Sequence, residues 1–382
     1  MSVAAQDLSH RKDLPARATA INGMCYRKFQ MTPNKQTTPK RFAPLGIIFG
    51  FIGLLLFAYF VRKAGPGEIL SGIRRLGFGL ILILAISSIR HIVRSLAWIK
   101  CIEKPFNLRF RDALAARLMG DALGNIIPLA SVAISEPSKA VFVKDRIPLM
   151  VGLSALAIEN IFYSLSVALF IFAGTTTLLL SFSLPKALRY ASIGALVTVV
   201  IIVPLGFFVI RKQARFISGA LEFLSARGIA RKWMTKVTPR AQTLEERVYG
   251  FYERNQRSLI PIFCLEVLFH FAGVVEIFTT LWFISPIAPS WRQAFILESV
   301  NRIINVAFKF MPLRVGVDEG GTEQVSKVLG FLKSTGVTLA IVRKSRDIFW
   351  AMIGVVLLVK KGFSLRNVPE QEVIEAKVQT SV

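Results

Sequence analysis

Charge-free stretches constrain this chain more than any other feature. A helix that crosses about 30 Å of hydrocarbon needs roughly 20 apolar residues, and residues 42–61 and 190–210 each contain no charged side chain. Residues 147–185 are interrupted only by Glu159, and we expect one span there, followed by a short outer loop near residues 175–183. Similar patterns with a few ionisable groups occupy residues 76–100, 258–286 and 336–358. Hydrophobic residues make up 53% of the sequence, more than a soluble domain shields easily from water. The chain is therefore predicted to be an all-α polytopic membrane protein with about six spanning helices.

Two further apolar segments, residues 109–146 and 291–333, are interrupted by charged residues and proline, so they do not fit a simple membrane span. Each begins with an aromatic-Arg-x-Ala pattern, reaches an apolar-apolar-Pro step and then a glutamate. Proline ends or kinks a helix, and non-helical backbone at membrane depth must be buried in protein or line a watery cavity. We therefore predict two re-entrant, broken helices. An odd number of spans separates them, so they would enter from opposite sides as an inverted repeat, a pattern that marks a transporter's central site. Two ordinary kinked helices with a chance similarity are the alternative.

The net charge of +25 is spread over connecting loops, whereas a nucleic-acid-binding protein concentrates basic residues on one soluble face. No nucleic-acid partner is therefore expected. Loops rich in Lys and Arg stay in the cytoplasm. We expect a disordered basic tail over residues 1–41, a transmembrane domain over 42–360 with a cytoplasmic basic loop at 211–257, and a cytoplasmic tail over 361–382, in the cell inner membrane. Basic residues in 62–75 oppose this orientation, but the longer loops outweigh them. The 211–257 loop fits either a surface-lying amphipathic helix that favours anionic lipid or a solvated linker.

Charged side chains within the spans are candidates for function, because each costs a few kcal/mol at the bilayer centre. Arg90 and Arg94 lie one turn apart and are suited to hold a phosphate, although snorkelling to the interface fits equally. Glu159 is either a neutral acid or a partner of one of these arginines. Charges of both signs surround the second broken segment and the next span, at Glu298, Arg302, Arg314, Asp318, Glu319, Arg343, Arg346 and Asp347. They predict an ion-pair network that either holds the re-entrant turn or contacts a zwitterionic or anionic headgroup.

No enzyme chemistry, metal or cofactor is predicted. Glu266, His270 and Glu276 share one span, but a metal site needs further ligands. The sequence contains no Gly-rich phosphate loop, Ser-His-Asp arrangement or zinc-binding motif. The three isolated cysteines give no disulfide framework; they are Cys25, Cys101 and Cys264.

The runs GNIIPLASVAISEPSKAV, ESVNRIINVAFKFMPLRVGVDEGG and LAIVRKSRDIF resemble the lysylphosphatidylglycerol synthase transmembrane-region family, also called flippase-like. The resemblance covers residues 45–360 and is greatest to the hopanoid-biosynthesis-associated branch. It implies that the first family motif is formed by Asn125, Pro128 and Glu136, and the second by Arg302, Pro312, Gly316, Glu319, Gly320, Arg343 and Arg346. The chain departs from the family at Ser135-Glu136, where Gly-Glu is usual, and at Glu159-Asn160, where an acidic-Arg pair is usual. The soluble domain of the aminoacyl-transferring members is not expected here.

The repeat and the resemblance together imply translocation, or flipping, of a lipid or amphiphilic precursor across the cytoplasmic membrane. Its partners would be membrane lipids with anionic or zwitterionic headgroups, and both a homo-oligomer and a pathway complex are compatible with the sequence. One alternative is a non-transport scaffold in envelope or hopanoid lipid biosynthesis. Another is a membrane-embedded lipid-modifying enzyme, which usually needs several carboxylates in the loop after the first span; residues 62–75 offer only Glu68.

Overall fold

The computed structural model describes residues 74, 76–126, 131–212, 216–227, 231–308, 314 and 317–364. All of them lie within one compact unit, Ala43–Val382. Every regular element in these ranges is a helix, which confirms the predicted all-α class. The predicted N-terminal tail and the first predicted span, residues 42–61, lie outside the described residues, as do residues 365–382 of the predicted C-terminal tail.

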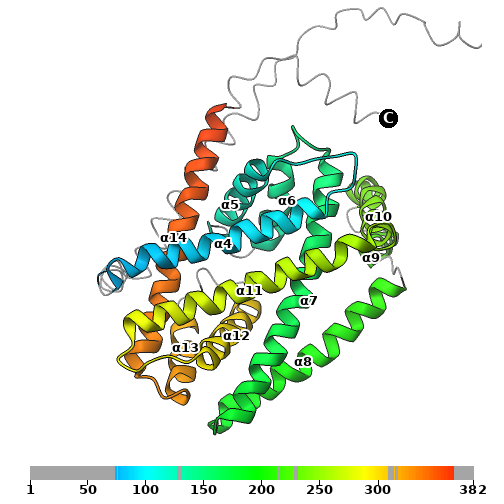
Figure 1. Ribbon diagram of the computed structural model, residues 1–382. Coiled ribbons are helices and arrows are strands. Elements are labelled where there is room, and N and C mark those ends of the chain that lie inside the picture. Colours follow the sequence, from blue (N-terminus) through cyan, green and yellow to red (C-terminus); the bar gives the residue numbers. More distant parts are fainter. Residues whose placement is uncertain are drawn as a thin grey trace, which may run out of the picture. The chain divides into compact units, whose positions relative to one another are not determined.

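Four of the described helices are long and apolar enough to cross a membrane. They are α4 (Gly79–Lys100), α7 (Leu149–Ser181), α8 (Lys186–Arg211) and α11 (Gln256–Ile284) (Figure 1). Each coincides with a predicted span. Mean hydropathy peaks in α8, which packs on α7 and leaves most of its apolar side chains exposed. Such a surface is stable where it contacts lipid.

The outer loop predicted near residues 175–183 is wrong. Helix α7 continues for 33 residues to Ser181. Thr175 and Leu178 are buried, and Leu178 belongs to an apolar cluster with Ile277 of α11. This packing favours continued helix where the sequence pattern alone allowed a turn.

The predicted span at 336–358 lies within α14, which extends over Lys333–Ser364. The helix is 32 residues long and therefore has sufficient length to cross a bilayer. Its first half carries Arg343, Lys344, Arg346 and Asp347, and α14 is not among the four helices that are also apolar enough. The total of six spans therefore stays a prediction.

In each of the two segments predicted to be broken helices, the structure describes two helices. In the first, α5 (Phe110–Ile126) is followed by α6 (Ser131–Phe142). In the second, α12 (Trp291–Ala307) is followed by α13 (Val317–Val328). The first helix has 17 residues and the second 12 in both segments. Helix resumes by Ser131, so Glu136 lies on regular α-helix rather than in an irregular stretch.

The order α4–α5–α6–α7 is matched by α11–α12–α13–α14. Helices α4 and α11 pack side by side in opposite directions: Gly79 lies against Phe283, whereas Arg94 at the other end lies 3.8 Å from Glu266 (Figure 1). Packing between the two sets is reciprocal, because α5 packs on α14 and α12 packs on α7. Each four-helix set therefore packs against the other through these two helix pairs.

Two glycines allow these reciprocal contacts. A Cβ atom on Gly174 of α7 would lie 2.2 Å from the Cβ of Ser299 on α12. A Cβ atom on Gly354 of α14 would lie 2.3 Å from the carbonyl oxygen of Leu118 on α5. Small residues let helix backbones approach closely inside a membrane. One contact joins α7 to α12, and the other joins α14 to α5.

The predicted basic loop at 211–257 is largely helical. It contains α9 (Phe216–Ala226) and α10 (Arg231–Arg254), which pack against each other. Phe251 of α10 is buried in the core beside α7, whereas Phe223 of α9 is 56% exposed. The described residues of this loop are therefore helical rather than an irregular linker, and a surface position that favours anionic lipid stays a prediction.

Candidate functional site: a buried charge network

The interior of the helix assembly carries many charged side chains that are shielded from solvent. They come from α4, α5, α6, α7, α11, α12, α13 and α14. Within these eight helices, the Asp, Glu, Lys and Arg residues less than 9% exposed are Arg117, Lys139, Glu159, Glu266, Glu276, Glu298, Arg302, Asp318, Arg343, Lys344 and Arg346. Buried charges are stable only when they are paired and hydrogen-bonded.

Glu159 of α7 is the centre of the first group of ion pairs. Its Oε1 atom lies 2.7 Å from Arg94 Nη2 and 3.0 Å from Arg117 Nη2. Arg117 also donates to the backbone carbonyl of Arg94 at 3.0 Å. The three side chains therefore fasten α7 to α4 and α5.

The group extends to α6 through Asn160. Arg94 donates to Asn160 Oδ1 at 3.3 Å, and Asn160 Nδ2 donates to Glu136 at 2.9 Å. Lys139 lies 2.8 Å from both Glu136 and Asp121. The second half of the first broken helix is thus held to its first half by charge.

Glu276 of α11 is the centre of the second group. It accepts from Arg90 Nη1 at 3.2 Å and pairs with Arg346 of α14. Arg346 also pairs with Asp347 at 2.6 Å, and Arg314 lies 3.5 Å from the same carboxylate. Arg314 stands in the interruption between α12 and α13, so this group anchors the second break to α14.

The second broken helix contributes further pairs. Glu298 pairs with Arg302 one turn away on α12. On α13, Asp318 pairs with Arg343 at 2.9 Å, and Glu319 pairs with Lys344. The Glu319–Lys344 contact joins α13 to α14, and the Glu136–Asn160 contact joins α6 to α7.

Aromatic rings separate the arginines of the two groups. The Phe269 ring centre lies 4.7 Å from the Arg90 guanidinium carbon, 5.7 Å from that of Arg94 and 4.8 Å from that of Arg302. Arg94 also lies over Tyr163 at 4.0 Å. Cation–π attraction contributes about 2 kcal/mol at a desolvated site. One ring therefore helps to hold three like charges in a small space.

The structure brings most of the predicted site residues together and separates a few. Arg90 and Arg94 have side chains 13% and 14% exposed and are ion-paired, so they do not snorkel. Asn125 and Gly320 are exposed. Pro128, Pro312 and Gly316 lie outside the described residues. The predicted residues within the network are Arg90, Arg94, Glu136, Glu159, Arg302, Glu319, Arg343 and Arg346.

Sequence reasoning missed several members of the network. Arg117 and Lys139 lie inside the first broken segment, where a charge in an apolar stretch is itself a signal. Phe269 carries no such signal, because an aromatic residue on a spanning helix is ordinary. Its position among three guanidinium groups follows only from the packing of α11 against α4 and α12.

Several buried donors in the network have no hydrogen-bond partner among the described residues. They include Nε of Arg90 and Arg302, and Nε and Nη1 of Arg117 and Arg343. These N–H groups suit an anionic oxygen ligand. Within the described ranges, no group of three His, Cys, Asp or Glu side chains is placed to hold a metal.

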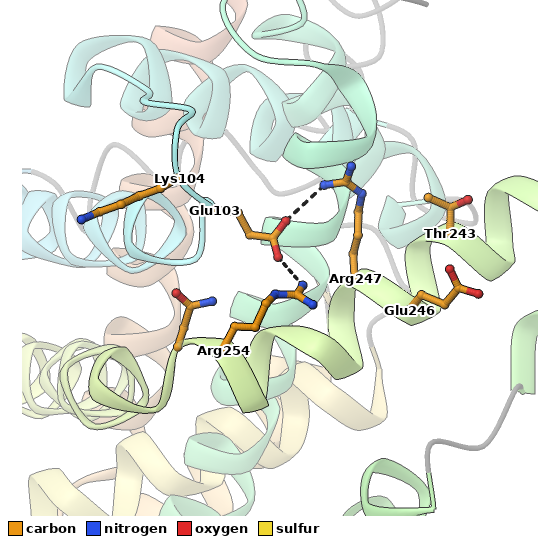
Figure 2. Close-up of a pocket in the computed structure, with 7 residues that line it drawn as sticks. Glu103, Lys104, Thr243, Glu246, Arg247 and Arg254 are labelled. Atoms are coloured by element: carbon orange, nitrogen blue, oxygen red, sulfur yellow. Dashed lines mark hydrogen bonds and ion pairs between the residues drawn. The ribbon is translucent and has the colours of Figure 1, made fainter. Parts of the chain in front are cut away.

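A separate polar pocket of about 560 Å³ lies where the turn after α4 meets α10. Figure 2 shows Glu103 between Arg247 and Arg254, with Lys104 directed away from them. The Glu103 carboxylate lies 3.1 Å from Arg247 and 2.5 Å from Arg254. Both arginines are at least one-third exposed, so the pairs contribute at most about 1 kcal/mol each. We assign them to holding this turn against α10.

Comparison with known proteins identifies the family. No curated protein and no solved structure matches the chain at a significant level. Residues 44–354 match the family described as Lysylphosphatidylglycerol synthase TM region. This match covers most of the sequence and includes all four apolar helices and both broken helices. The chain therefore belongs to the lysylphosphatidylglycerol synthase transmembrane-region family and is a multi-pass integral membrane protein.

Proposed function

We propose that this protein translocates a lipid or amphiphilic precursor between the leaflets of the cell inner membrane. The observation that carries the proposal is the pair of interrupted helices, α5–α6 and α12–α13, with buried charges on both sides of each interruption. Interrupted helices at corresponding positions of two halves are the pattern of a transporter's central site. An ordinary helix bundle gains nothing from so many buried charges, because their desolvation is costly.

The proposed arrangement of the two halves is an inverted repeat. It is supported by the antiparallel packing of α4 and α11 and by the reciprocal pairs α5–α14 and α12–α7. In each half, a polar contact also joins the second part of the broken helix to the following long helix, Glu136–Asn160 in the first half and Glu319–Lys344 in the second. In such a repeat, the two broken helices reach the membrane interior from opposite sides and give an amphiphile a polar path.

The proposed ligand group is an anionic or zwitterionic headgroup. Arg90, Arg94 and Arg302 gather around Phe269, and two of them retain buried N–H groups without a partner. A phosphate oxygen accepts strong hydrogen bonds from such groups. The basic helices between α8 and α11 favour a cytoplasmic location for that segment and for both termini.

Reconstitution tests the proposal directly. Purified protein is incorporated into vesicles that contain fluorescent phospholipids with different headgroups, and the rate of leaflet exchange is followed by quenching from outside. We expect acceleration by the unaltered protein for at least one headgroup. Vesicles in which exchange stays at the protein-free rate for every headgroup, while a known lipid-translocating protein is active, would overturn the proposal.

Two variants test whether the cluster around Phe269 carries the activity. Phe269→Leu removes the aromatic face and leaves every ion pair intact. Because a desolvated cation–π contact is worth about 2 kcal/mol, we expect at least about a tenfold lower exchange rate, the equivalent of about 1.4 kcal/mol. Arg292→Gln, at an exposed position of α12, serves as the control and should keep the full rate. Equal exchange rates for the two variants would show that the cluster around Phe269 does not contribute to translocation.

A further inference from the structure

Glu266 of α11 is a buried carboxyl group that lacks a hydrogen-bond donor. Its side chain is 0% exposed, and neither Oε1 nor Oε2 has a hydrogen-bond partner among the described residues. The Arg94 Nε atom is 3.8 Å away, beyond hydrogen-bonding distance. An ionised carboxylate in this position would therefore lie buried without the hydrogen bonds that normally stabilise it.

Glu159 faces Glu266 from α7. Both carboxyl groups lie against the Arg94 guanidinium, Glu159 at 2.7 Å and Glu266 at 3.8 Å. Glu159 Oε1 is occupied by Arg94 and Arg117, whereas Glu159 Oε2 also lacks a donor. Two adjacent carboxyl groups do not both ionise readily, and one proton held between them supplies the missing donor to both.

The other groups near Glu266 do not supply that donor. Arg94 and Arg117 are committed to Glu159, and the Cys101 thiol after α4 is a weak donor. His270, one turn along α11, contacts Ser166 through Nε2 at 3.1 Å. Arg90 and Arg346 pair with Glu276, and Arg302 pairs with Glu298. The Tyr252 ring of α10 packs on Phe162, and its buried hydroxyl has no hydrogen-bond partner among the described residues, so it does not donate to Glu266.

We propose that Glu159 and Glu266 form a proton-binding site, in which two buried carboxyl groups from α7 and α11 share one proton beside Arg94. The proton comes from water and binds a carboxylate oxygen, so the occupied pair carries one negative charge. That negative charge faces the two arginines that pair with Glu159, Arg94 and Arg117.

The site also links proton binding to headgroup binding, a consequence that rests on the proposed function. If an anionic headgroup draws Arg94 away from Glu159, the carboxyl pair loses a positive neighbour and holds its proton more strongly. Linkage is reciprocal, so proton binding favours headgroup binding to the same extent. An anionic lipid and a proton would then occupy the protein together.

Infrared spectroscopy of the full-length protein in vesicles tests the proton site without any transport measurement. A protonated carboxyl group gives a carbonyl stretching band that an ionised carboxylate lacks. We expect this band in the unaltered protein at neutral pH and its loss on alkalinisation. Glu266→Gln should remove the band, because Glu159 then ionises against its two arginines. Glu159→Gln should remove it as well, because Glu266 alone then pairs with Arg94.

Glu276→Gln is the matched control, since Glu276 lies on the same helix and is ion-paired with Arg90 and Arg346. It should leave the band unchanged. Absence of the band in the unaltered protein, or its persistence in Glu266→Gln, would overturn the proton site. Lipid exchange in the same vesicles separates the two proposals: exchange without the band rejects only the proton site, and the band without exchange rejects only translocation.

Discussion

Arg117 lies in the interior of the molecule with 1% of its side chain exposed. It supports Glu159 together with Arg94, so removing it leaves a buried carboxylate with one cation instead of two. Breaking a buried pair costs about 3–5 kcal/mol, and we expect Arg117→Gln to lower the free energy of unfolding by about 3 kcal/mol because Arg94 remains. Denaturation of the detergent-solubilised protein measures this change.

Arg111→Gln is the control for this prediction, because Arg111 lies on the same helix and is exposed. Its effect should be within about 0.5 kcal/mol. Adding Glu159→Gln to Arg117→Gln should recover part of the loss, since the buried carboxylate is then absent. A double variant that loses the full sum of both single effects would contradict this account of the ion pair.

At the residue scale, the sequence predicted which side chains matter better than it predicted their partners. A charge within an apolar stretch is visible without a structure, and Arg90, Arg94, Glu159 and Arg302 were identified in this way. The pairing of Arg90 with Glu276 depends on the antiparallel packing of α4 and α11. That packing joins residues far apart in the chain and leaves no local sequence pattern.

At the scale of helices, Gly354 determines how closely α14 packs on α5. A Cβ atom there would lie 2.3 Å from the backbone carbonyl oxygen of Leu118, and backbone does not move aside as a flexible side chain does. We expect Gly354→Ala to destabilise the protein by about 1–3 kcal/mol. Gly194→Ala in α8 meets no atom within 4 Å and should stabilise by up to about 1 kcal/mol through helix propensity. Opposite signs in parallel thermal unfolding experiments are expected, and equal shifts would contradict the close contact.

Helix α8 offers a test of its lipid-facing surface. Val200 and Phe208 are both 57% exposed, but Val200 lies near the middle of the helix and Phe208 near its end. A lysine at the centre of a span costs about 2.5–3.5 kcal/mol for insertion, whereas one near an end reaches the interface by snorkelling. Val200→Lys should therefore reduce the membrane-inserted fraction in an insertion assay much more than Phe208→Lys. Similar reductions would place Val200 away from the bilayer centre.

Helices with long apolar runs were predicted well from the sequence. Helix ends that depend on packing against other helices were predicted less well. Proline lacks the N–H that a helix interior needs, and it was the basis for predicting a break in each of the two segments. Pro128 and Pro312 lie outside the described residues. The continuation of α7 to Ser181 was missed, since Thr175 to Ser181 has the composition of either a loop or a helix. Burial of Leu178 against α11 decides between the two.

At the scale of the whole molecule, the sequence predicted a repeat but not how the helices of the two segments pack. The matching patterns around 109–146 and 291–333 identified corresponding segments. The packing of α5 on α14 and of α12 on α7 could be seen only in the structure, because each of these helices packs on the long helix of the other half.

The last prediction concerns the side of the membrane on which each connecting segment lies. If α8 and α11 each cross once, the turns at Ser183 and Ala288 lie on one side, and Arg240 between these helices lies on the other. All three positions are exposed. In a background without native cysteines, Ser183→Cys and Ala288→Cys should react with a membrane-impermeant thiol reagent in spheroplasts, and Arg240→Cys only after permeabilisation. The reverse pattern would overturn the cytoplasmic assignment of α9 and α10 while leaving two crossings. Labelling of Ser183→Cys and Ala288→Cys from different sides would exclude single crossings by both helices, and with them the opposite entry of the two broken helices.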